Sequence, residues 1–113
     1  MKLSLKHQAH HKIYNEACSV TEYKFDDDKM DFSIAIISGR YPEQNRVMNE
    51  ISNELAYVTE GEGKIVINHQ EQPLSAGDVI IIEAGEKYYW EGNMKLFVTC
   101  NPTWKPEQRK IVE

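Results

Sequence analysis

The residues best suited to chemistry in this sequence are carboxylates, a phenol and a thiol that fall on short apolar segments. Glu50 and Glu54 are four positions apart, so they share one face if the segment between them is an unbroken β-strand. Two carboxylates in one apolar cavity cannot both ionise cheaply, so the pKa of one of them should rise. A glutamate with a raised pKa exchanges protons near neutral pH, which makes it a candidate general acid or base.

An aromatic run and a cysteine add to this set. Tyr88 and Trp90 alternate around Tyr89 and share one strand face. They are candidate pocket walls, because aromatic side chains carry much of the burial in a small domain, and Tyr88 is also a candidate partner for a raised glutamate. Cys100 has no histidine that the sequence places beside it for activation, so we interpret it as a buried small apolar residue.

Histidines are concentrated at the N-terminus, where His7, His10 and His11 lie among lysine and glutamine. They could suggest a metal site, but no cysteine or carboxylate stands beside them at ligand spacing. A solvated arm is the better interpretation.

Composition limits the classes of function. A chain of 113 residues has room for one domain, and its 41% hydrophobic and 27% charged residues are typical of soluble globular proteins. The net charge of −5 argues against a nucleic-acid partner. No apolar run approaches the length of a membrane span or of a signal-peptide core, so we expect no membrane partner and a cytoplasmic location. Cys18 and Cys100 do not form a disulfide framework.

The elements that must position these residues are strands. Apolar or alternating runs of four to eight residues are separated by glycine or acidic turns, with turns expected at 61–63 and 92–93. About nine such strands and no long amphipathic helix predict an all-β sandwich or barrel. We divide the single domain into an N-terminal arm or edge strand (1–16), a barrel (17–100) and a C-terminal tail (101–113), in which the prolines allow only a short helical turn at 107–111.

The stretch 54–92 resembles the small single-domain, RmlC-like cupins, which are double-stranded β-helix barrels. Glu54 and Gly61 match the end of the first cupin motif, with six residues between them, and Gly77 and Gly85 match the two glycines of the second. Fifteen residues separate Gly61 from Gly77, a short link of the compact cupin kind. The resemblance implies an all-β, cupin-like jelly-roll barrel.

The metal-binding positions of the family are mostly changed. With a three-residue spacing before Glu54, the two histidine positions of the first motif fall on Met48 and Glu50; with a four-residue spacing they fall on Val47 and Asn49. The third histidine position is Tyr88. The resemblance therefore implies a pocket with no cofactor, or at most a metal on Glu50 and Glu54. Its lining would be Met48, Asn49, Glu50, Glu54, Tyr88, Trp90 and Cys100.

Three functions remain open at this point. The first is binding of a small polar molecule, such as a sugar or small acid, in the barrel without a transition metal. The second is a metal-independent isomerase or epimerase that uses Glu54 and Tyr88 as acid and base. The third is a metal-dependent enzyme with unorthodox ligands. By resemblance we also expect a homodimer, formed through apolar outer faces that carry Ile34 and Ile36, Leu55 or Phe97.

Overall fold

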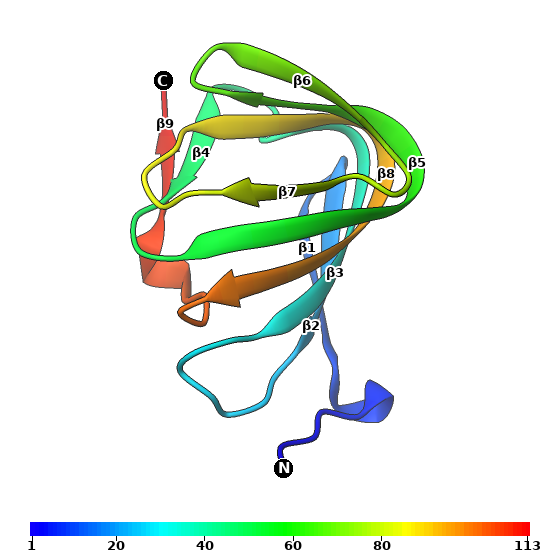
Figure 1. The fold of residues 1–113 in the computed structure, drawn as a ribbon, viewed down its shortest axis with the longest axis vertical. Coiled ribbons are helices and arrows are strands. Elements are labelled where there is room, and N and C mark those ends of the chain that lie inside the picture. The colour runs from blue at the N-terminus through cyan, green and yellow to red at the C-terminus, as the bar shows by residue number, and fades with distance from the viewer.

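The computed structural model describes all 113 residues and contains nine β-strands and two short 3-10 helices (Figure 1). This confirms the predicted all-β class. The helices are η1 (Lys6–Gln8) and η2 (Pro106–Gln108). The strands are β1 (His10–Asn15), β2 (Cys18–Tyr23), β3 (Phe32–Tyr41), β4 (Arg46–Asn49), β5 (Asn53–Ile67), β6 (Gln70–Ser75), β7 (Val79–Ile82), β8 (Tyr88–Asn101) and β9 (Arg109–Val112).

Strand β8 lies at the centre of the sheet. It pairs antiparallel with β3 along one edge and with β5 along the other. Strands β2 and β1 extend the sheet beyond β3, and β6 and β7 both pair with β5. The start of β8 meets β4 at the pair Val47–Tyr88, and β4 pairs with β9. The sheet curls around an interior (Figure 1). Alternate side chains of the central strand β8 are buried in this interior.

Glycines mark the bend that the two longest strands share. Gly63 of β5 lies opposite Gly92 of β8. A Cβ on Gly92 would lie 2.5 Å from the Cα of Gly63, and a Cβ on Gly63 would lie 2.4 Å from the carbonyl oxygen of Glu91. Gly61 has a φ of +84° and the same lack of space. The turns expected at 61–63 and 92–93 are therefore wrong, because both strands continue through a bend that the glycines permit.

The C-terminal segment is part of the barrel. In place of a helical turn at 107–111, the chain forms η2 and then β9, whose residues 109–112 pair with β4. The buried amide of Gln108 holds the segment. Its Oε1 accepts hydrogen bonds from the backbone N–H groups of Ile51 (2.9 Å) and Ser52 (2.7 Å), and its Nε2 donates to Ser52 Oγ (2.9 Å).

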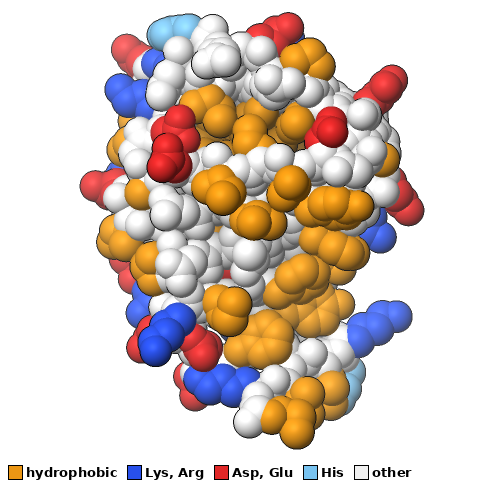
Figure 2. Space-filling model, viewed as in Figure 1, with side chains coloured by type: hydrophobic (Ala, Val, Ile, Leu, Met, Phe, Trp, Pro, Cys, Tyr) orange, Lys and Arg blue, Asp and Glu red, His pale blue; other side chains and the backbone are white.

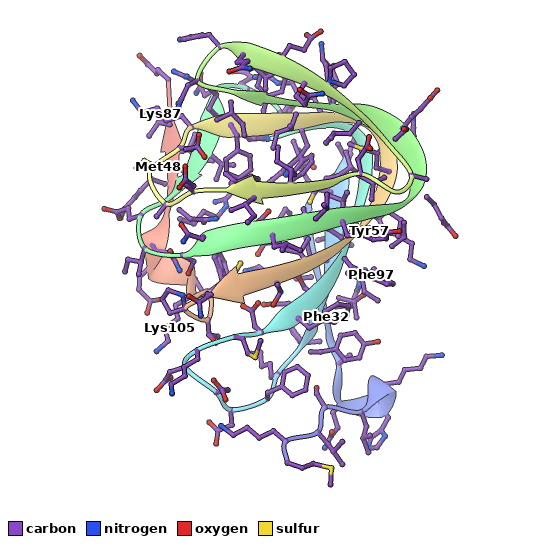
Figure 3. All side chains as sticks on the ribbon, viewed as in Figure 1. Phe32, Met48, Tyr57, Lys87, Phe97 and Lys105 are labelled. Carbon is purple, nitrogen blue, oxygen red and sulfur yellow. The ribbon has the colours of Figure 1, made fainter.

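The outer surface of the sheet carries a band of apolar side chains that crosses four strands. Ile34 on β3 lies opposite Phe97 on β8, Phe97 lies opposite Tyr57 on β5, and Tyr57 lies opposite Val79 on β7. Figure 2 shows apolar side chains running across this face, and Figure 3 places Phe32, Phe97 and Tyr57 in a row along it. None of the helices is long and apolar enough to cross a membrane.

Candidate binding cavity in the barrel

The barrel contains a cavity of about 630 Å³. This volume lies in the range of small-molecule sites in proteins. Its walls come from β1, β2, β3, β4, β5 and β8, from the loop between β2 and β3, and from the C-terminal segment. The aromatic side chains that line it include Tyr14, Tyr41, Tyr88, Trp90 and Trp104.

A chain of side-chain hydrogen bonds crosses one wall of the cavity. The indole Nε1 of Trp104 donates to Asn49 Oδ1 at 2.9 Å, and Asn49 Nδ2 donates to the Tyr88 hydroxyl at 3.5 Å. Because the tyrosine oxygen accepts from the amide, its own proton is free for another acceptor. Burial, and then the negative charge of Glu54, raise the pKa of Tyr88 well above 10. Tyr88 is therefore a neutral hydrogen-bond donor at physiological pH.

Glu54 of β5 is half-buried in the cavity wall. Burial, and next the negative charge of Asp31, raise the pKa of Glu54 from an ordinary 4.5 to about 7. The thiol of Cys100 lies 3.9 Å from Glu54 Oε1 and lowers this pKa as a donor. Burial raises the pKa of Cys100 itself, so the thiol stays protonated. Glu54 can thus take up or release a proton near pH 7.

Asp31 is held in place by the backbone. Its Oδ1 accepts from the N–H of Cys100 at 2.7 Å and its Oδ2 accepts from the N–H of Trp104 at 3.0 Å. The two bonds join the loop before β3 to the end of β8 and to the C-terminal segment. Asp31 thereby positions Trp104 and supplies a fixed negative charge near Glu54.

A second polar group faces the cavity from β9 and β3. Arg109 donates to the hydroxyl of Tyr41 from Nε at 2.9 Å and from Nη2 at 2.6 Å. The guanidinium carbon lies 5.4 Å from the ring centre of Tyr14 and 5.7 Å from that of Tyr41. Burial raises the pKa of Tyr41, although the charge of Arg109 opposes the change.

Five of the residues that the sequence singled out line this cavity: Asn49, Glu54, Tyr88, Trp90 and Cys100. Met48 and Glu50 do not. Glu50 is exposed and its carboxylate lies 3.5 Å from Lys110 Nζ on the outer surface. The reason is register: β4 ends at Asn49 and β5 begins at Asn53, so the irregular residues between them break the alternation that would have put Glu50 beside Glu54.

Several lining residues were not anticipated from the sequence. Tyr14 and Arg109 reach the cavity from segments expected to be an N-terminal arm or edge strand and a C-terminal tail, and Asp31 and Tyr41 reach it from within the expected barrel. One feature of the sequence could have indicated that the C-terminal segment packs on the barrel. Trp104 is a large aromatic residue in a proline-containing segment, and such a ring needs a surface to pack against. No sequence spacing links Tyr41 with Arg109.

The comparisons with known proteins agree with this architecture. Residues 44–99 match the family model of the Cupin domain. The chain belongs to the cupin family. Its matched region contains Glu54, Gly61, Gly77 and Gly85, the four positions that carry the motif resemblance. No curated protein sequence matches this cupin.

Solved structures share the cupin fold over nearly the whole chain. One is Pac13, a nucleoside dehydratase, with a TM-score of 0.88 and 17% identity over 100% of this chain and 92% of that one. A Y89F variant of the Streptomyces protein has been solved with uridine. KdgF from Halomonas has a TM-score of 0.71 and 10% identity over 95% of this chain and 97% of that one. CapF from Staphylococcus aureus has a TM-score of 0.75 and 20% identity, with 93% of this chain covering 34% of that one. At these identities the likeness shows the fold.

The metal-binding positions of the cupin motifs correspond here to Val47, Asn49, Glu54 and Tyr88, all of which line the cavity. This is the assignment with four residues between the second histidine position and Glu54. This donor set does not fit a transition metal. Val47 has no donor atom, the one oxygen of Asn49 that could coordinate accepts from Trp104, and Tyr88 has a pKa well above 10. No three His, Cys, Asp or Glu side chains are grouped so that they could hold a metal ion. Glu50 is exposed beside Lys110 and does not line the cavity with Glu54.

Proposed function

We propose that this cupin binds a small polar molecule, such as a sugar or a small acid, inside the barrel. The observation that carries the proposal is the cavity, in which aromatic walls surround a few converging polar groups. Glu54 and Tyr88 supply an acceptor and a donor on one wall, and Asn49 orients the donor. The uridine bound by the structurally similar Pac13 supports a ligand of this size and polarity.

The experiment is a titration of uridine, galactose and lactate, followed by the fluorescence of Trp90 and Trp104 and by NMR. We expect saturable binding of at least one of these molecules, and a roughly tenfold loss of affinity in Tyr88→Phe, because one hydrogen bond to the ligand is removed. Tyr89→Phe is the matched control, since Tyr89 is the next residue of β8 and its ring packs against Arg40. Equal affinities in wild type and Tyr88→Phe, or no binding of any of the three, would contradict the proposal.

A second candidate is acid–base catalysis without a metal, as in an epimerase or isomerase. It is favoured by the pKa of about 7 for Glu54 and by the buried phenol of Tyr88, which lines the same cavity and remains protonated. In such a reaction the Glu54 carboxylate removes a proton from the carbon next to a carbonyl group. Tyr88 donates a hydrogen bond to the carbonyl oxygen, which becomes the enolate oxygen, and Glu54 then returns the proton to carbon.

The test of this candidate is exchange of substrate C–H protons in D₂O, observed by NMR on a ligand that the titration has identified. Glu54→Gln should abolish the exchange and leave binding within a few-fold of wild type. Glu50→Gln, a carboxylate change on the outer surface, should leave both unchanged. Binding without exchange in the wild-type protein would restrict the function to recognition.

We also propose that the protein is a cytoplasmic homodimer. The apolar band of Ile34, Phe97, Tyr57 and Val79 supports a partner surface on the outside of the sheet. The two free cysteines, Cys18 and Cys100, support a reducing compartment. Sedimentation equilibrium should give a dimer for the wild-type protein and a monomer for Phe97→Glu. A wild-type protein that remains monomeric at high micromolar concentration would exclude the dimer.

A further inference from the structure

Arg109 is a cation at the cavity wall that has no carboxylate partner. Its guanidinium has five N–H groups, of which two donate to the Tyr41 hydroxyl, so three have no partner in the protein. The ion pairs of the protein involve other cations: Lys2, Lys64 and Lys110. This is unexpected in a chain with 18 acidic and 13 basic residues, where carboxylates are in excess.

A second unpaired cation lies beside the same aromatic ring. Lys12 Nζ is 4.8 Å from the ring centre of Tyr14 and 5.8 Å from that of Trp104, and the Arg109 guanidinium carbon is 5.4 Å from the Tyr14 ring centre. Both cations lie near the Tyr14 ring, and neither makes an ion pair. Lys12 does not itself line the cavity, whereas Tyr14 and Arg109 do. The electron-rich ring stabilises each cation, and an anion bound close to Tyr14 would be attracted by both positive charges.

The hydrogen bonds orient a further donor toward the same place. The Tyr41 hydroxyl oxygen accepts two N–H groups from Arg109, so both of its lone pairs are in use and its proton is left to donate. A charged donor, Arg109, and a neutral donor, Tyr41, thus lie together at this part of the cavity wall. The carboxylates that also line the cavity make no ion pair with Arg109; they are Glu22, Asp26, Asp27, Asp28, Asp31 and Glu54.

We propose that Arg109 and Tyr41, assisted by the positive charge of Lys12 near the Tyr14 and Trp104 rings, form an oxyanion subsite, so that the ligand of this cavity carries a carboxylate or phosphate group. The inference rests on the proposed binding function and narrows its ligand class. The anionic group lies at Arg109, whose planar fork suits oxyanions. The uncharged, hydroxyl- or carbonyl-bearing part of the ligand extends toward Tyr88 and Glu54. A small organic acid or a phosphate ester of a small polyol has this form.

The test titrates inorganic phosphate and, separately, acetate into ¹⁵N-labelled protein and follows the Arg109 side-chain Nε–H signal and the indole signal of Trp104. Saturable binding in the millimolar range is expected for the wild-type protein, with at least a tenfold loss in Arg109→Gln. Lys110→Gln is the matched control, because Lys110 is the next residue of β9 and lies beside Glu50 outside the cavity. If Arg109→Gln does not fold, Lys12→Gln and Tyr41→Phe should each weaken phosphate or acetate binding by three-fold or more.

The outcomes separate the subsite from the proposed function. Phosphate and acetate that fail to bind the wild-type protein, or bind Arg109→Gln as well as wild type, overturn the subsite. Uridine or galactose binding that depends on Tyr88 would then still support the broader function. Arg109-dependent anion binding supports the subsite even where neither neutral molecule binds.

Discussion

Replacement of Glu54 by glutamine should make the protein more stable at high pH. The pKa of Glu54 is about 7 in the folded protein and 4.5 in an ordinary environment, because burial and the charge of Asp31 disfavour the carboxylate. A raised pKa means that the folded state binds this proton more tightly than the unfolded state. The folded protein therefore loses stability as the pH rises from 4.5 to 7, and the loss is complete above that range.

The magnitude follows from the two pKa values. A shift of one unit corresponds to about 1.4 kcal/mol, so ionisation of Glu54 costs the wild-type fold roughly 0.8 kcal/mol at pH 5 and roughly 3.3 kcal/mol at pH 8. The glutamine variant does not have this cost. Because solvent in the cavity screens part of the charge, we expect the free energy of unfolding of Glu54→Gln, relative to wild type, to increase by about 1 to 2.5 kcal/mol between these pH values.

Urea denaturation of both proteins at half-unit intervals from pH 5 to pH 8 measures this difference. The m-values should agree, so that the change in midpoint reports stability alone. Glu50→Gln serves as the control, because Glu50 is exposed beside Lys110. A difference between wild type and Glu54→Gln that stays constant with pH would refute the reasoning, since it would show that Glu54 does not titrate with a raised pKa.

Two further predictions concern the parts of the fold that shape the cavity. Gly63→Ala should lower the free energy of unfolding by about 3 kcal/mol, because the new Cβ would lie 2.4 Å from the backbone oxygen of Glu91. A decrease below about 0.5 kcal/mol in urea denaturation would contradict the close approach of β5 and β8. Gln108→Ala should cost about 2 kcal/mol, because two backbone N–H groups lose their acceptor. It should also weaken any Arg109-dependent phosphate binding, measured by NMR, whereas Glu107→Ala at the exposed neighbouring position should change neither.

Many strands of the barrel were predictable because buried apolar residues alternate with exposed residues along a strand. The alternation of β8, with Leu96, Val98 and Cys100 inside and Phe97 outside, is visible in the sequence and is present in the structure. The cupin motif added the positions of Glu54 and the glycines. Strand β6 has no such alternation, because all its side chains but Leu74 are exposed. Its place in the sheet depends on backbone pairing with β5, which the pattern of residue types does not show.

By itself, the sequence predicted the all-β class from local periodicity, and its motif resemblance predicted the cupin frame. It named seven candidate lining residues but left the register around Asn49 and Glu50 open, and five of the seven line the cavity. Only the tertiary structure decided that Glu50 faces solvent, because the break between β4 and β5 changes the register. It also decided that Arg109 meets Tyr41 and that Asp31 holds Trp104. Those contacts join segments about 70 residues apart in the chain, and no local pattern of residue types encodes which distant segments a closed barrel brings together.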